Sequence, residues 1–168
     1  ARIAVNRLLG MIRTGSEFGP FPNDVLDADA NPLKADYFEF ASRFNDDGSI
    51  AEVTRVEFRY PGEPPLLRTW GAQEDPPELP DGMEVDGPGE LWIVLIDVTT
   101  GVEQEFMMLS EVRSAEFTLR YAIGPKLIKG TVDIIFEPSL AVNDGVWTPA
   151  TPETVRLVAS AMPRRSAE

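Results

Sequence analysis

Apolar and polar residues alternate with a period of two along several separate segments of this chain. Over residues 37–44, Phe38 and Phe40 fall on one side, whereas Tyr37 and Glu39 fall on the other. A period of two places successive side chains on opposite faces of a β-strand. This pattern predicts that the core of the protein is built from β-sheet rather than from helices.

The turn chemistry between these segments supports the same fold class. Asn45–Ser49 is rich in residues that tolerate left-handed dihedrals, and it predicts a hairpin between 37–44 and a return strand whose stripe is Val56, Phe58 and Tyr60. Val53 is out of phase with that stripe, so we expect a bulge or a late start. Further strands are predicted at 66–70, 91–98, 103–109, 115–123 and 131–136, with a hairpin centred on Asp144-Gly145. The expected fold is mainly β, an antiparallel β-sandwich or barrel with a short N-terminal helix and extended loops.

The first residues carry the one clear helical pattern. Val5, Leu8, Leu9 and Ile12 follow the spacing of one helix face, which predicts an amphipathic helix over residues 3–13. Two interpretations stay open, a helix that covers the end of a β core and a helix that docks on an acidic neighbour. The charges of this segment are all positive and belong to Arg2, Arg7 and Arg13.

Differences in periodicity and in glycine and proline content divide the chain into three parts. We expect an N-terminal helix and irregular arm over 1–36, a β domain over 37–162 and a tail over 163–168. The β domain contains an acidic, Pro- and Gly-rich loop at 71–90. At the end of the β domain, residues 153–162 fit a strand and a helix equally well, and we favour the strand. A long arm without periodicity suits contact with another subunit.

Charge and composition exclude several functions. A net charge of −13, from 15 basic and 28 acidic residues, repels nucleic acid and anionic lipid, so we expect neither as a partner. The chain has no histidine and no cysteine, which removes the usual neutral-pH proton carrier, thiol chemistry and most transition-metal ligation. We therefore expect that the protein is not an enzyme and that it binds no cofactor. No signal peptide or membrane-spanning run is visible, which predicts a cytoplasmic or virion location.

One loop has the start of a calcium-binding pattern. Asp27, Asp29 and Asn31 offer oxygen atoms at alternate positions, as a calcium loop does. Pro32 stands where the turn glycine belongs and Phe38 where the bidentate glutamate belongs, so an EF-hand is excluded. What remains is a weak candidate cation site, and the expectation is that no metal binds.

A second constellation concerns paired carboxylates. Asp97 with Glu103 or Glu105 across a hairpin has the residue types of a glycosidase acid and base. Nothing distinguishes these residues among the 28 acids, and the interpretation as solvated surface carboxylates is favoured.

The appendages and the absence of catalytic signals point to a structural or interaction protein, such as a capsid or tail accessory protein of a phage virion. Its expected partners are other protein subunits, in a homo- or hetero-oligomer. Two alternatives stay open, a carbohydrate- or calcium-dependent binding module and an acidic immunity or inhibitor protein for a basic partner. The interface candidates are Arg2, Arg7, Arg13, Phe18, Phe21, Trp70 and Trp147.

Overall fold

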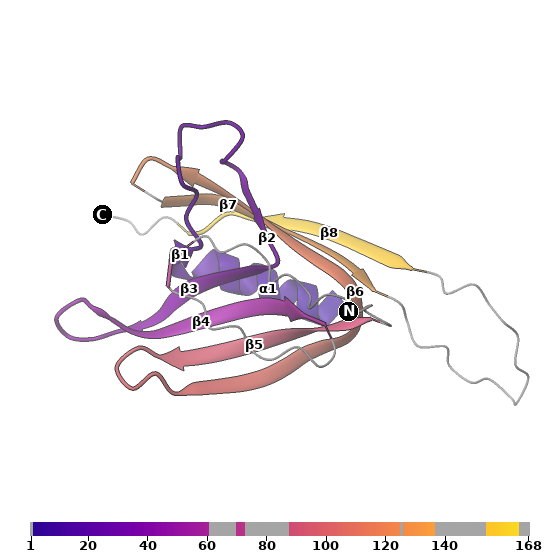
Figure 1. Cartoon of the computed structure of the whole chain (residues 1–168), viewed down its shortest axis with the longest axis horizontal. Helices are drawn as coiled ribbons and strands as arrows, with labels where there is room; N and C mark the ends of the chain where they lie inside the picture. The colour runs from indigo at the N-terminus through magenta and orange to yellow at the C-terminus, as the bar shows by residue number, and fades with distance from the viewer. Residues whose placement is uncertain (1, 61–69, 73–87, 125, 137–153, 165–168) are drawn as a thin grey trace, which may run out of the picture.

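The structure, a computed structural model, describes residues 2–60, 70–72, 88–124, 126–136 and 154–164. Within these residues the chain forms one helix and eight strands (Figure 1). In chain order they are α1 (Arg2–Thr14), β1 (Ser16–Gly19), β2 (Leu33–Ala35), β3 (Tyr37–Phe44), β4 (Ile50–Arg59), β5 (Gly89–Asp97), β6 (Glu103–Ala122), β7 (Lys126–Phe136) and β8 (Val155–Ala161).

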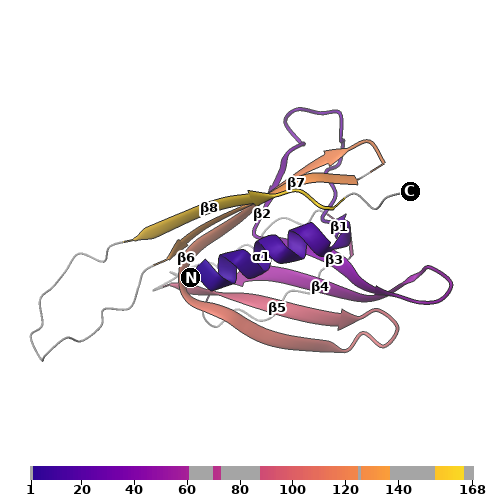
Figure 2. The ribbon, with the colours of Figure 1, turned by 180° about the vertical axis from the view of Figure 1, so that it is seen from behind.

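All eight strands belong to one antiparallel sheet. Its order is β1-β3-β4-β5-β6-β7-β8, and β2 pairs with β6 outside this path. The mainly β fold with a short N-terminal helix is thus confirmed. The sheet is open, and the long strand β6 joins its two parts, one with β3, β4 and β5 and the other with β7 and β8. Figure 2 shows α1 between these two parts.

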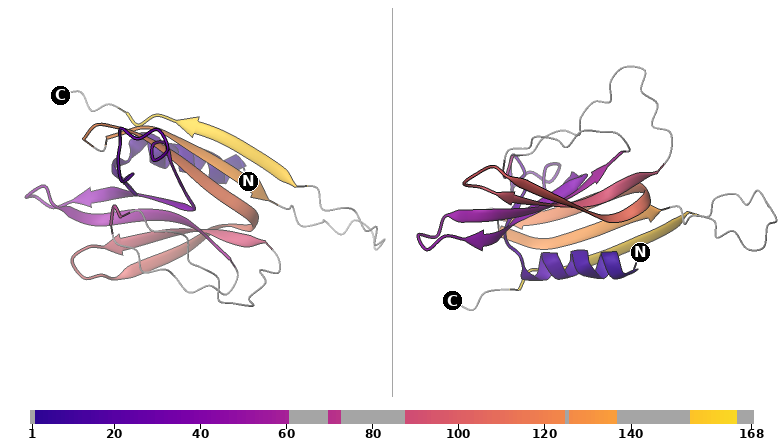
Figure 3. Two further views of the ribbon diagram at one scale, coloured as in Figure 1. Left: turned by 45° about the horizontal axis from the view of Figure 1, so that its top comes forward. Right: turned by 90° about the horizontal axis from the view of Figure 1, so that it is seen from below.

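The helix forms because its apolar face has a sheet to cover. Leu8 and Ile12 of α1 are fully buried and belong to the same core cluster as Phe38, Phe117 and Ile134 of the sheet. The helix packs against β8 and β7, as Figure 3 shows from below. The apolar stripe predicted from the sequence is therefore the buried face, and the interpretation of a helix that covers the β core is confirmed.

The strand β6 differs from the prediction. Residues 103–109 and 115–123 were expected as two strands, but Glu103–Ala122 is one strand of 20 residues. Its first half pairs with β5 and its second half with β7 and β2. Glu111 has φ 59° near the point where these pairings change, and this local break interrupts the alternation that sequence periodicity depends on.

The segment 14–36 is also more ordered than expected. It contains β1, which pairs with β3, and β2, which pairs with β6. The side chain of Asn31 donates to the carbonyl of Tyr121 at 2.9 Å and accepts from its N–H at 3.0 Å. These contacts tie the segment to its own sheet, so within the described residues the arm and the β domain share one core.

Other expectations are met or lie outside the described residues. Residues 155–161 form a strand, β8, which resolves the choice left open from the sequence. The β3–β4 turn is present, and the register shifts near Arg43 agree with the bulge expected from Val53. The structure describes neither residues 66–69, nor 73–87 of the acidic loop, nor the predicted hairpin at Asp144-Gly145.

Candidate interaction surface

All charged residues on the exposed side of α1 are basic. Arg2, Arg7 and Arg13 are exposed, and the helix contains no acidic residue. Arg13 lies in the last turn, where a positive charge interacts favourably with the carbonyl end of the helix. These three predicted interface residues therefore lie together on one element and are available to a partner.

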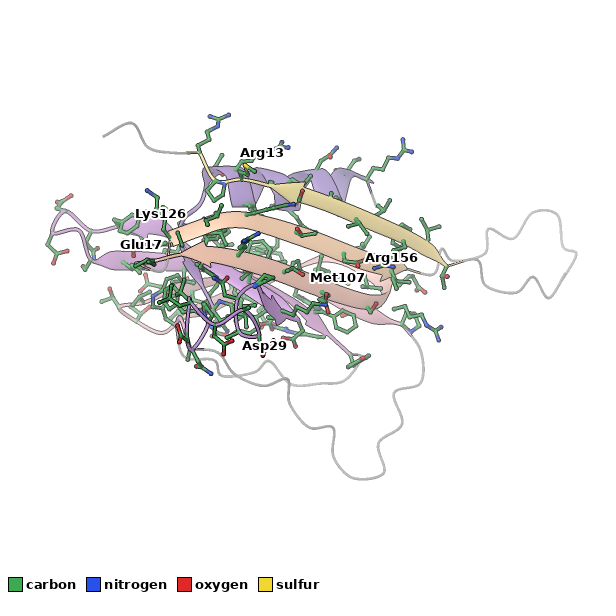
Figure 4. The ribbon with its side chains drawn as sticks, turned by 90° about the horizontal axis from the view of Figure 1, so that it is seen from above. Arg13, Glu17, Asp29, Met107, Lys126 and Arg156 are labelled. Carbon is green, nitrogen blue, oxygen red and sulfur yellow. The ribbon has the colours of Figure 1, made fainter. Side chains whose placement is uncertain are left out.

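A hollow at the end of α1 adds two more cations. It has a volume of about 280 Å³ and lies between the residues after α1, the start of β7 and the residues after β8. Lys126 and Arg164 line it together with Glu17, and the N–H of Arg164 donates to the carbonyl of Arg13 at 3.0 Å. Figure 4 shows Glu17 and Lys126 near each other toward one end of the molecule. We call this site the basic hollow.

The basic hollow has two features of a binding surface. Neither Lys126 nor Arg164 forms an ion pair with any described residue, so their charges are uncompensated there. Glu17, at its rim, has φ 46°, a left-handed conformation that a residue with a side chain rarely adopts. Unusual backbone of this kind is concentrated at sites of function.

Acidic side chains gather at the far ends of the two long hairpins. Asp46 and Asp47 are exposed in the β3–β4 turn, and Glu52 lies directly opposite Asp97 on the neighbouring strand. The hydroxyl and N–H of Ser49 lower the pKa of Asp47. In the β5–β6 turn, hydrogen bonds led by the N–H of Thr100 lower the pKa of Asp97. Asp47 and Asp97 are therefore fully charged at neutral pH.

The first half of β6 forms a second kind of surface. Among the described residues only β5 pairs with Glu103–Leu109, because β7 begins to pair at Val112. The opposite edge of Glu103–Ser110, which we call the β6 edge, has no strand partner in that part of the chain. Two large apolar side chains on it, Phe106 and Met107, are 51% and 53% exposed. An unpaired edge with exposed apolar residues is prone to pair with another chain.

A chain of ion pairs joins charged side chains of β3, β4 and β6, most of them buried. Arg55 Nε donates to Glu39 Oε2 at 3.1 Å, and both side chains are almost fully buried. Arg59 contacts Glu57 and donates to Glu105 Oε1 at 2.7 Å. Each carboxylate thus has an arginine partner that compensates its charge, although the buried Glu57 Oε2 accepts no hydrogen bond from the described residues.

The carboxylates of the predicted pair have lowered pKa values, which do not suit a glycosidase acid. The hydrogen bond from Arg59 holds the pKa of Glu105 below its usual value, as the turn does for Asp97. A general acid in a glycosidase needs the opposite, a raised pKa that keeps its proton at working pH. Glu103 lies opposite Ile96 in the register, at the tip of the hairpin.

The weak cation candidates serve their own loop. Asp27 accepts the N–H of Asp29 at 2.9 Å, and the side chain of Asn31 is engaged with β6 and with the carbonyl of Val25. Among the described residues, no group of three acidic side chains is placed to hold a metal ion. The side-chain oxygen atoms of Asp27 and Asn31 therefore accept hydrogen bonds that hold the loop in shape.

The aromatic interface candidates are used within the chain. Phe18 is buried and its ring lies 5.8 Å from that of Phe40, so it is unavailable to a partner in this conformation. Phe21 contacts the rings of Trp70 and Tyr121 at 6.5 and 6.1 Å between centroids. Trp147 lies outside the described residues. Two exposed apolar residues on β6, Phe106 and Met107, were not selected by the sequence analysis.

A second, larger hollow of about 560 Å³ lies over β2, β6, β7 and β8. Its cations are neutralised, because Lys34 pairs with Glu116 at 3.0 Å and Arg156 pairs with Asp133 at 2.5 Å. The hydrogen bond from Arg156 also lowers the pKa of Asp133. This hollow therefore offers no free charge comparable to the basic hollow.

Comparison with protein-family models, with curated proteins and with solved structures finds no match for this chain. No helix among the described residues has the length and apolar character needed to cross a membrane.

Proposed function

We propose that this chain is a non-enzymatic structural protein that assembles with further copies of itself through the β6 edge. A capsid or tail accessory protein of a phage virion is one example of such a subunit. The proposal rests on one observation, the β6 edge, which pairs with no described strand and which carries the exposed Phe106 and Met107. A neighbouring subunit would satisfy the free backbone groups by adding a strand and would bury the two apolar side chains.

The surroundings of the β6 edge support this role. Glu103 precedes the apolar residues at the tip of the hairpin, and a charged residue at an edge opposes indiscriminate pairing while leaving a matched partner free to bind. Full burial of one large apolar side chain contributes about 1.5 to 3 kcal/mol. Phe106 and Met107, each half exposed, have about half of that still to gain.

The native mass of the purified chain, measured by light scattering over a range of concentrations, tests the proposal. We expect a mass well above the 18.5 kDa of one chain, and a variant with Phe106→Lys and Met107→Lys that dissociates at concentrations where the wild type stays assembled. The matched control is Ile123→Lys, which removes an apolar residue 78% exposed after β6 and should leave the mass unchanged. A wild-type chain that is monomeric at every concentration would overturn the proposal.

A further inference from the structure

The charges of this molecule are segregated rather than evenly spread. Despite the net charge of −13, α1 is purely basic and leads to the basic hollow of Lys126 and Arg164. Acidic residues dominate the hairpin ends, where the β3–β4 turn carries Asp46 and Asp47 without a cation partner among the described residues. Two complementary surfaces therefore exist on one chain.

The β3–β4 turn has the form needed to enter the basic hollow of a second molecule. Every residue from Asn45 to Ser49 is exposed, and in Figure 1 this turn extends beyond the rest of the described structure. Asp47 holds the turn in shape by accepting from the N–H and hydroxyl of Ser49 at 2.9 and 2.6 Å. Asp46 makes no such bond and is free to meet a cation.

We infer that the basic hollow binds the β3–β4 turn of a second copy of this chain. Lys126 and Arg164 then face Asp46 and Asp47 of the other copy, with Arg13 close beside the contact. The hollow and the turn lie toward the same end of the molecule, as α1, β1 and the turn show in Figure 1. A two-fold axis at that end forms both contacts at once, which gives a self-complementary dimer.

A second copy fits this surface better than an arbitrary acidic protein. Copies with a net charge of −13 repel one another wherever acidic surfaces meet, so a contact that places a cationic surface against an anionic one is favoured. The basic hollow and the turn supply such a match twice in one dimer. This inference rests on the proposed self-assembly and specifies a contact separate from the β6 edge.

Charge reversal with cross-rescue tests the contact. Lys126→Glu reverses the hollow and Asp46→Lys reverses the turn, and both residues are exposed, so the fold is retained. Because each substitution acts on both contacts of the dimer, we expect either variant to weaken self-association about tenfold. Mixing the two variants in equal amounts restores association, since one contact is native and the other has both charges exchanged. The variant with both substitutions recovers it as well.

The control is a reversal away from the contact, Asp29→Lys in the β1–β2 segment, which is an exposed position. It should neither match the effect of Lys126→Glu nor depend on mixing. Association of the wild type should also weaken between about 0.05 and 0.5 M salt, where screening shortens the range of charge interactions.

The outcomes separate this inference from the proposed function. A wild type that assembles, but that neither reversal weakens or that the mixture fails to rescue, overturns the inference and leaves the β6 edge intact as an explanation. A wild type that never self-associates overturns the proposed function, and this contact with it.

Discussion

The close packing of Ile12 of α1 against Gly130 of β7 leads to a quantitative prediction. Gly130 of β7 lies under the helix, and a Cβ added to it would be 3.0 Å from Cδ1 and 3.1 Å from Cγ2 of Ile12. Ile12 is fully buried, so its side chain has no open space into which it can move. Gly130→Ala should therefore push the helix from the sheet or force Ile12 from its rotamer.

The magnitude follows from two opposed effects. The added contacts are at least 0.4 Å shorter than the optimum of about 3.5 to 4.0 Å for two carbon atoms, and overpacking of this kind costs about 1 to 3 kcal/mol. Replacing glycine restricts the unfolded chain, which returns about 0.4 to 1 kcal/mol. We expect Gly130→Ala to lower the free energy of unfolding by about 1 to 2 kcal/mol, which shifts the urea midpoint by about 0.5 to 1 M.

Two companion variants make the measurement decisive. Gly10→Ala places a methyl group on α1 where nothing lies within 4 Å, so it should raise stability by up to about 1 kcal/mol. Ile12→Val removes the nearer methyl group, and combined with Gly130→Ala it should cost less than the sum of the two single changes. Equal or greater stability of Gly130→Ala, or strict additivity in the double variant, would refute the packing argument.

Two further predictions concern the buried tyrosine hydroxyls and the loss of stability at low pH. The Tyr37 hydroxyl donates to the carbonyl of Ala72 at 2.7 Å, whereas that of Tyr121 is buried with no hydrogen-bond partner among the described residues. Tyr37→Phe should therefore cost about 1 kcal/mol in urea unfolding and Tyr121→Phe almost nothing, and equal losses would contradict this. Because Arg59 lowers the folded-state pKa of Glu105, that carboxylate stabilises the fold above its unfolded pKa of about 4.3 and loses this effect as the pH falls. The stability difference between wild type and Glu105→Gln, at most about 1 kcal/mol at pH 7, should shrink toward pH 3, and a constant difference would count against the ion pair.

Local periodicity predicted those parts of the fold that depend on local sequence. The helix stripe of Leu8 and Ile12 and the alternation around Phe38 each lie within one element, and both were found where expected. The strands β1 and β2 have only four and three residues, and their pairing with β3 and β6 is set by distant segments. No period is readable over so few residues, so the segment around them was expected to be irregular.

The surfaces were predictable in the same uneven way. The cations of α1, including Arg13, follow from a helical pattern, because a helix that buries one face must expose the other. Lys126 and Arg164 come close to Arg13 only after the chain has folded, because these residues are far apart in the sequence. The strands β1 to β6 lie between Arg13 and Lys126, and the rest of β7 and all of β8 lie between Lys126 and Arg164. Net charge describes the sum over the chain and carries no information on where each sign gathers.

This dependence on folding connects the packing of α1 with the proposed dimer contact. The residues that line the basic hollow come from three places, the chain after α1, the start of β7 and the chain after β8, and α1 packs against both of these strands. The spacing of Arg13, Lys126 and Arg164 is therefore set by how the helix sits on the sheet, which Gly130 and Ile12 control. A change that moves the helix without altering any charge, such as Gly130→Ala, should weaken the dimer as well as the fold. Gly10→Ala changes neither the charge nor the docking and should leave dimerisation as it is.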